Sequence, residues 1–247
     1  MTQENQGLGE QALNKAAEIG ISSQLDEVES LDVNIETNPL QLLQGQVDAV
    51  TIDGVGLVMH KDLRMEEMEL KMSSVAINPL SAAFGKIELT KPTDASVDVV
   101  LTEPDINRAF NSEYVRNQLK NLQVQVNGQP MTIDAQHVDF RLPGDGKVAL
   151  NAKVLLHETG VTNQVCFTAV PRVVANGQTV SLEDVHYGEG EELSPELTKA
   201  LVDQTSELLN LSNFDLKGMS LRVKTLEVGA GNLTFEGEAH VEQIPTS

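Results

Sequence analysis

The sequence is poor in cysteine, in aromatic residues and in long apolar runs: it has one Cys, no Trp, two Tyr and six Phe. A single cysteine, Cys166, excludes a disulfide within the chain, and we expect a free buried thiol because cysteine packs as a small apolar residue. Few aromatic rings argue against binding of sugars or single-stranded nucleic acids, which use rings as stacking surfaces. The core must therefore be built from Val, Leu, Ile and Met.

Basic residues are also few: 17 Lys and Arg against 37 Asp and Glu give a formal net charge of −20. Such a charge argues against nucleic-acid binding, which requires neutralisation of phosphates, and against attraction to anionic membranes. The start, MTQENQGLGEQ, lacks the basic and apolar regions of a signal peptide, and no run reaches the ~18 apolar residues of a membrane span. We expect a cytoplasmic protein without a signal peptide or transmembrane helix, at most peripheral at a membrane surface.

The sequence contains no grouping of residues typical of catalysis. Its five histidines are scattered singly, without a pair at metal-ligand spacing. No nucleophile elbow, phosphate-binding loop or dinucleotide fingerprint is complete. The acidic runs at 26–29 and 188–193 are interpreted as solvated charge. We therefore predict that the protein is not an enzyme and has neither a cofactor nor a metal site.

The first half of the chain combines one helix with many strands. Residues 1–7 are expected to be a disordered tip, and residues 8–247 a single domain. Leu8, Ala12, Ala16 and Ile19 have helical spacing. From Asp26 to Leu101 apolar residues alternate with polar ones, which is typical of antiparallel strands with one wet face. The alternation slips at Gly54 and at 66–67, and we interpret both slips as bulges in long, curving strands.

The second half of the chain likewise combines predicted helices and strands. Thr102 and Ser112 are candidate N-caps for one broken helix or two short helices over 103–120, and Ser194 followed by Pro195 predicts a further helix. Asn127-Gly128 predicts a hairpin between strands. The fold class is therefore α+β: a long, bulged, strongly curved antiparallel sheet wrapped around a few helices.

A short motif occurs twice. Asn38-Pro39-Leu40 and Asn78-Pro79-Leu80 are each followed by four residues and a glycine, which predicts a capped helical turn at a strand end. Two interpretations are open. The apolar residues of the turns either plug the end of the sheet, or form a lip that dips into a bilayer. The residues concerned are Leu40, Leu42, Leu43, Leu80 and Phe84.

Methionines gather in one stretch: Met59, Met65, Met68 and Met72 are four of the seven in the chain. Methionine adapts to irregular apolar partners, so this stretch either lines a cavity for flexible acyl chains or fills gaps in an ordinary core.

A resemblance to a known family covers nearly the whole chain, from about residue 20 to residue 242. The matching segments are Gly56-Leu57, Leu63-Arg64, Ile77-Asn78-Pro79-Leu80, Phe84-Gly85-Lys86-Ile87, Leu101-Thr102-Glu103 and Asp105-Ile106-Asn107-Arg108-Ala109. The sequence resembles the LmeA-like phospholipid-binding family in its cyanobacterial branch. The resemblance implies a tubular lipid-binding (TULIP-like) half-barrel with acyl chains held between sheet and helix. Mycobacterial relatives are exported and linked to lipoglycan maturation, and neither that envelope role nor an enzymatic one is carried over.

We therefore expect a non-enzymatic lipid-binding or lipid-transfer protein for phospholipid or glycolipid, with transient membrane contact and no nucleic-acid partner. The expected acyl-chain contacts are Leu57, Met59, Met65, Met68, Leu70, Met72, Leu80, Phe84, Ile106 and Phe110. The expected headgroup contacts are Arg108 and Lys86, although Arg108 can equally pair with Asp105 or lie on a solvated helix face. The alternatives are an acidic interaction or structural protein with a packed core and no ligand, and an enzyme acting on lipids.

Overall fold

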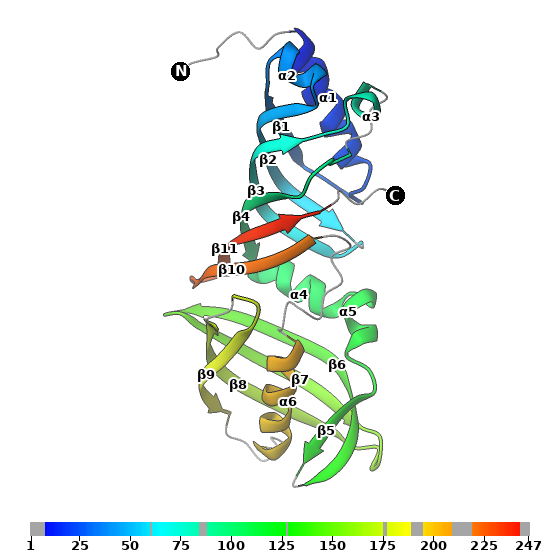
Figure 1. The fold of residues 1–247 in the computed structure, drawn as a ribbon. Helices are drawn as coiled ribbons and strands as arrows, with labels where there is room; N and C mark the ends of the chain where they lie inside the picture. The colour runs from blue at the N-terminus through cyan, green and yellow to red at the C-terminus, as the bar shows by residue number, and fades with distance from the viewer. Residues whose placement is uncertain are drawn as a thin grey trace.

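The computed structural model describes residues 8–59, 61–83, 88–126, 128–174, 177–188, 195–208 and 219–242. The expected disordered tip at 1–7 lies outside the described residues, as do His60, Phe84, Lys86 and Ser194. Two curved antiparallel sheets stand end to end in an elongated molecule, with helices packed against each of them (Figure 1). The predicted α+β class of curved antiparallel sheets with few helices is confirmed.

The upper sheet of Figure 1 has six strands in the order β1-β2-β3-β4-β11-β10. The chain leaves it after β4, builds the other sheet, and returns to add β10 and β11 beside β4. Its strands are β1 (Ser30–Glu36), β2 (Gln46–Met59), β3 (Leu63–Ala76), β4 (Thr93–Thr102), β10 (Met219–Val228) and β11 (Asn232–Val241). Its helices are α1 (Leu8–Ser22), α2 (Pro39–Leu43) and α3 (Pro79–Ala83).

The lower sheet has five strands in sequence order, each pairing with the next. They are β5 (Leu122–Val126), β6 (Gln129–Gly144), β7 (Lys147–Leu156), β8 (Thr162–Val173) and β9 (Val180–Tyr187). Helices α4 (Glu103–Asn111) and α5 (Glu113–Gln118) lie between the sheets, and α6 (Pro195–Leu208) packs on the lower one (Figure 1). The break between α4 and α5 falls at Ser112, the predicted second N-cap.

Described side chains of α6 and of the lower sheet form packed clusters. Leu197 and Ala200 of α6 pack with Ile133, Val154 and Val165 of the sheet, each at most 9% exposed. Phe110 packs against this cluster, its ring centroid 5.9 Å from that of Phe140. Ile106 packs against a neighbouring cluster around Phe167. Cys166, flanked by the buried Val165 and Phe167, has its side chain on the opposite face and is a half-buried free thiol, less buried than expected.

The slips in the alternating pattern of β2 and β3 are not bulges. The two strands pair in constant register from Gln46↔Ala76 to Met59↔Leu63. The apolar side chains of both strands change face together at two levels of the pair. One level is next to Gly56 on β2 and the other is next to Ser74 on β3, and the φ angles of these residues are 63° and 56°. Glycine is favoured at 56, because it adopts a positive φ without the strain of a Cβ. The predicted bulges at Gly54 and 66–67 were therefore wrong, and register shifts occur in other pairs of strands, such as β6 with β7.

Helix α1 forms where the sequence predicts it but buries a different stripe. Ala12, Ala16 and Ile19 are exposed, whereas Ala17 is buried and packs with Leu13 and Ile21 against the upper sheet. The rotation is fixed by a polar contact, since the backbone N–H of Ile35 on β1 donates to Asn14 Oδ1 at 3.0 Å. The spacing of Leu8, Ala12, Ala16 and Ile19 predicts the helix but does not identify its buried face, because alanine occurs on both faces.

Helix α4 substitutes for a missing strand along the free edge of β6. The Glu103 carboxylate accepts from the N–H of Leu142, and the Asn107 amide makes two hydrogen bonds with the backbone of Phe140. Asn111 donates to the carbonyl of Val138. Four helical residues rise about 6 Å and two strand residues about 6.6 Å, so residues four apart on α4 meet residues two apart on β6. The family-like segment 103–109 therefore joins the two sheets.

Arg64 ties β3 to the start of α4. Its guanidinium contacts Asp105 at 2.9 Å, Glu66 at 2.6 Å and Glu29 at 2.7 Å. The Asp105 side chain, 6% exposed, also completes the capping box of α4 with Thr102. Leu63-Arg64 and the segment 105–109, which carry the family resemblance, are thus brought together at the joint between the sheets.

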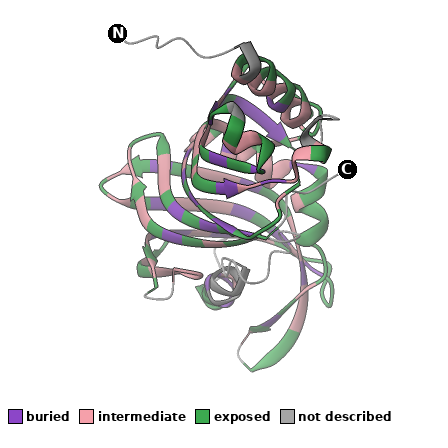
Figure 2. Cartoon of the chain, turned by 45° about the horizontal axis from the view of Figure 1, so that its top comes forward, coloured by how far each residue is buried: buried purple, intermediate pink, exposed green. Residues whose placement is uncertain are grey.

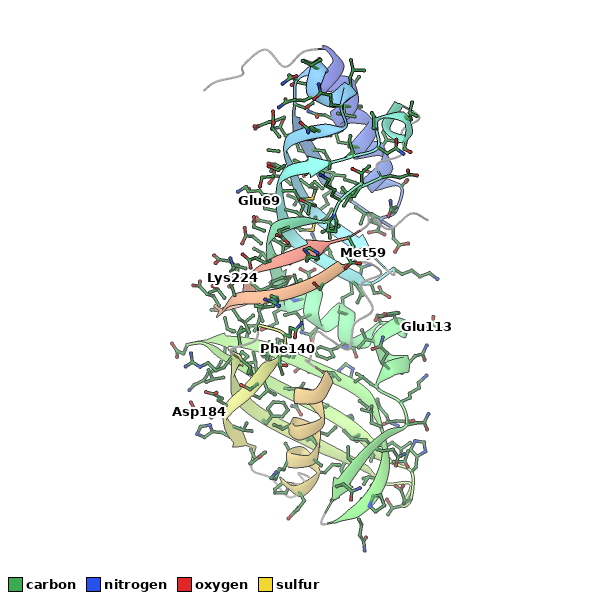
Figure 3. All side chains as sticks on the ribbon, in the orientation of Figure 1. Met59, Glu69, Glu113, Phe140, Asp184 and Lys224 are labelled. Carbon is green, nitrogen blue, oxygen red and sulfur yellow. The ribbon has the colours of Figure 1, made fainter. Side chains whose placement is uncertain are left out.

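A row of acidic side chains crosses the outer face of the upper sheet. Asp32, Asp53, Glu69, Asp98 and Glu236 stand directly opposite one another on β1, β2, β3, β4 and β11. Figure 3 shows Glu69 on this outer side and Met59 on the other. Partial burial, followed by the charges of Glu69 and Asp32, raises the pKa of Asp53 above its ordinary value.

We expect Asp53→Asn to increase the free energy of unfolding at pH 7 by roughly 0.2–1 kcal/mol, because like charges directly opposite in a sheet destabilise it. The raised pKa means that ionisation of Asp53 costs stability above that pKa. The advantage of Asn should therefore shrink as pH falls and the wild-type carboxyl becomes protonated in the folded state. Urea unfolding at several pH values measures this, with Glu227→Gln, opposite Thr234, as a control. An equal increase in the free energy of unfolding of the control would refute the idea that the acidic row destabilises the sheet.

Candidate functional site

An apolar cavity of about 520 Å³ lies between α1 and the concave face of the upper sheet. Its volume falls within the usual range of small-molecule sites, about 300–1,000 Å³. The sheet supplies the floor and α1 the opposite wall. The lining residues are Leu13, Ala17, Ile21, Gln24, Leu25, Leu31, Val33, Ile35, Val47, Val50, Ile52, Leu57, Met59, Met65, Met68, Leu70, Met72, Val75, Ile77, Leu89 and Val241.

The lining carries almost no polar chemistry. Among these described residues Gln24 alone is polar, and none is charged. Burying an ammonium, carboxylate or phosphate against such walls would cost several kcal/mol, because no lining side chain could compensate its charge. Hydrocarbon gains instead about 0.8 kcal/mol for each methylene removed from water. The cavity is therefore suited to apolar chains and excludes the polar part of any amphiphile.

Buried residues lie toward both ends of the cavity, and half-buried residues lie between them. Ile35, Val47 and Val75 are buried at one end, and Leu57 is buried at the other. Between them, Val50, Ile52, Met68, Leu70 and Met72 are half-buried although they face inward. Figure 2 shows this mixture of buried and half-buried positions along the strands. The middle of the floor is thus not covered by packed side chains, and an apolar guest could occupy it.

Six of the ten predicted acyl-chain contacts line this cavity: Leu57, Met59, Met65, Met68, Leu70 and Met72. Three do not: Ile106 and Phe110 pack in the lower half, and Leu80 is 74% exposed on α3. The tenth, Phe84, lies outside the described residues. The methionine-rich stretch is therefore one region of a single cavity, whereas the helical stripe of α4 belongs to the packed joint.

The sequence reasoning missed the residues that α1 and β1 contribute. Leu13, Ala17 and Ile21 form one wall, and Leu31, Val33 and Ile35 extend the floor. The spacing of Leu13, Ala17 and Ile21, four residues apart, was the available signal. It was outweighed by the stripe through Ile19, which is 62% exposed.

Arg108 lies beside the turn between β2 and β3 and does not line the cavity. Its Nε donates to Asp62 Oδ1 at 3.1 Å and its Nη2 to the carbonyl of Lys61 at 2.8 Å. It thus pairs with Asp62 and not with Asp105, which binds Arg64. The same turn is fixed from the other side, because the N–H of Lys61 donates to Asp26 at 2.7 Å. The other headgroup candidate, Lys86, lies outside the described residues.

The two Asn-Pro-Leu turns have matching structures. Asn38 Oδ1 accepts from the N–H groups of Leu40 and Gln41, and Asn78 Oδ1 accepts from those of Leu80 and Ser81. The match extends to an acidic residue ten positions after each asparagine. Gln41 donates to Asp48, and Ser81 donates to Glu88. The predicted repeat of local structure is therefore present in the described residues.

These turns close one end of the cavity only in part. Leu42 packs against the cluster that contains Val47 and Ile77, as the plug interpretation requires. Leu40, Leu43 and Leu80 do not, because they are 67%, 78% and 74% exposed. The plug interpretation is thus wrong for these three leucines.

Two further properties of the described residues constrain the chemistry. No group of three or more His, Cys, Asp or Glu side chains among them is arranged to hold a metal ion. None of the described helices has both the length and the apolar character needed to cross a bilayer.

Comparison with known proteins identifies a family for this chain. Neither the curated proteins nor the solved structures compared with the chain gave a match. A family model described as LmeA-like phospholipid-binding matches residues 5–238 of the 247, which includes β1–β11 except the last residues of β11, and all the cavity residues but Val241. This agrees with an apolar cavity between sheet and helix and supports a lipid-binding role. The chain belongs to the LmeA-like phospholipid-binding family.

Proposed function

We propose that the protein is a non-enzymatic lipid carrier that takes up the acyl chains of phospholipid or glycolipid in the cavity between α1 and the upper sheet. The observation that supports this most is the lining, which is apolar except for Gln24 in a cavity of about 520 Å³. Binding energy would come from removing methylenes from water, and the polar headgroup would stay outside.

We propose Leu57, Met59, Met65, Met68, Leu70 and Met72 as acyl-chain contacts on the sheet. Leu13, Ala17 and Ile21 would contact the chains from α1. Methionine suits this position because its unbranched, polarizable side chain adapts to guests of different length and unsaturation. Ile106 and Phe110 are left out, because they are committed to packing in the lower half.

A headgroup contact is proposed at the β2–β3 turn, beside Met59 at the rim. Met59 is 38% exposed and lines the cavity, and Arg108 is hydrogen-bonded to this turn two and three residues further on. A phosphate there would share Arg108 with Asp62, whose side chain is also 38% exposed.

We propose that residues 8–247 act as one domain in which the lower half is a rigid support. The sheets are joined by backbone hydrogen bonds as well as by α4: Gly231 donates to Leu142 and Val223 donates to Gly177. Described residues of the lower half form packed clusters, whereas the apolar cavity described above lies in the upper half.

The alternative of a packed interaction protein predicts no continuous apolar cavity near Met59 to Met72, so the cavity there favours the carrier. Catalysis on lipids would need polar groups at the bound chain, and the described lining offers Gln24 alone.

Transfer of a fluorescent phospholipid from quenched donor vesicles to acceptor vesicles tests the proposal. We expect the transfer rate to rise in proportion to protein concentration, because a carrier moves lipid one load at a time. Turnover of the lipid to a new chemical species would instead indicate an enzyme. A rate equal to that without protein, together with no lipid bound, would indicate the packed interaction protein.

A further inference from the structure

Three leucines protrude from the end of the molecule that lies furthest from the lower sheet. Leu40 and Leu43 belong to α2 and Leu80 to α3, and both short helices lie at the top of Figure 1. We name these three residues the lip. With exposed fractions of 67%, 78% and 74%, they are the most exposed large apolar residues of the described chain. Exposed apolar groups held this far out of a fold are typical of interaction sites.

The backbone holds the two halves of the lip side by side. The N–H of Ile77 donates to the carbonyl of Gly45 at 2.8 Å, which joins the end of the first turn to the start of the second. Gly45 has a φ of 73°, and a Cβ there would lie 2.4 Å from the carbonyl oxygen of Ile77. Asn38 and Asn78 cap the two turns in the same way. The leucines are thus presented by a rigid base.

The lip protrudes, and the sequence around it is mainly acidic. Segments 36–48 and 76–88 contain Glu36, Asp48 and Glu88 against one basic residue, Lys86, and Asp48 and Glu88 accept hydrogen bonds from the two turns. A membrane-surface protein usually gains about 1 kcal/mol from each Lys or Arg near anionic lipid. Here three acidic residues outnumber the one lysine of these segments, and the net charge of −20 opposes attraction to anionic lipid.

We propose that the lip inserts its three leucines into the surface of a membrane whose headgroups carry no net charge, and that anionic lipid weakens this binding. The proposal rests on the proposed carrier function for its biological use. It also rests on the contact between the lip and the cavity, because Leu42 of the same turn packs against the buried end of the cavity. Insertion would therefore place that end of the cavity at the bilayer.

Vesicle flotation tests the proposal with three proteins. The wild type should bind phosphatidylcholine vesicles, and binding should fall as phosphatidylglycerol replaces phosphatidylcholine and recover when salt screens the charge. The triple variant Leu40→Ser, Leu43→Ser, Leu80→Ser should bind at least about tenfold less, since burial of one leucine is worth more than a factor of ten. Val161→Ser with Val174→Ser, exposed apolar residues of the lower half, should bind as the wild type does.

A tryptophan probe reports insertion directly, because the chain has no Trp. Leu43→Trp should shift its emission to the blue on phosphatidylcholine vesicles and be quenched by lipids brominated on their acyl chains, whereas Val161→Trp should do neither. The proposal would be overturned by binding that increases with phosphatidylglycerol, or by equal binding of the triple variant. It would also be overturned by a wild-type dimer that the triple variant converts to a monomer without any vesicle binding.

The two proposals can fail separately. If the protein binds vesicles through the lip but carries no lipid, the proposal for the lip stands and the proposed carrier function is refuted. If the protein carries lipid but floats with vesicles equally well with and without its lip leucines, the proposed carrier function stands and the proposal for the lip is refuted.

Discussion

Replacing Arg64 with Met is expected to lower the free energy of unfolding by about 3 kcal/mol. The loss arises because the Asp105 carboxylate, 6% exposed, would remain buried without the guanidinium that contacts it at 2.9 Å. Glu29 and Glu66 would add repulsion at the same place. Small domains have only about 5–15 kcal/mol in total, so urea unfolding should show a large fall in the midpoint.

Two further variants make the cause of that loss identifiable. Arg64→Met combined with Asp105→Asn should recover part of the stability, because the buried charge is then removed as well. Arg141→Met removes ion pairs to Asp139 and Glu103 from a side chain that is 61% exposed, and it should cost no more than about 1 kcal/mol. If Arg64→Met costs no more than Arg141→Met, the Arg64 cluster does not hold the joint.

The second large effect concerns the cavity. The double variant Ile52→Trp, Met68→Trp should lose at least about tenfold in lipid affinity while the fold remains stable. Both side chains point into the cavity from neighbouring strands, so the indole rings would occupy the space of an acyl chain. A titration with a fluorescent fatty-acyl phospholipid measures the affinity, and thermal unfolding measures the stability.

The matched control places the same rings on the outer face. Thr51→Trp with Glu67→Trp changes the residues immediately before Ile52 and Met68, and should leave affinity near that of the wild type. A packed interior would respond differently to the cavity variant, because overpacking typically costs 1–3 kcal/mol. Unchanged affinity, or destabilisation by that amount, would contradict an open cavity at Ile52 and Met68.

Much of this fold follows from local patterns in the sequence. Alternation identified the strands, and the caps at Thr102 and Ser112 identified α4 and α5, because both signals depend on residues near in sequence. The face of α1 was not decided by local pattern alone, because the stripe through Ile19 and the stripe through Ile21 both have helical spacing. It depends on the hydrogen bond between Asn14 and Ile35, which are 21 positions apart.

The candidate site was predictable where one strand pair supplies it. Met65 and Met72 lie on β3 opposite Leu57 and Val50 of β2, and Met68 lies opposite Gly54. Methionines that are close in the sequence therefore line one cavity in the structure. Ile106 and Phe110 were assigned to the same site from their helical stripe. That stripe is real, but it faces the lower half because Asn107 and Asn111 are bonded to the edge of β6. No periodicity indicates which sheet such a helix covers.

The repeated Asn-Pro-Leu motif illustrates the same limit at a smaller scale. The caps and turns were predictable from Asn38, Asn78 and the glycine spacing, since every interaction is local. Which leucines are covered was not, because Leu42 is partly buried against a cluster that includes the distant residues Val33 and Val75, while Leu40 and Leu43 stay exposed.

Native mass spectrometry of the freshly purified protein, with extraction and identification of any bound lipid, tests the carrier most directly. We predict a stoichiometric phospholipid or glycolipid on the wild type, retained in the Leu40→Ser, Leu43→Ser, Leu80→Ser variant and absent from Ile52→Trp, Met68→Trp. A bare mass for the wild type, persisting after incubation with vesicles, would contradict the account.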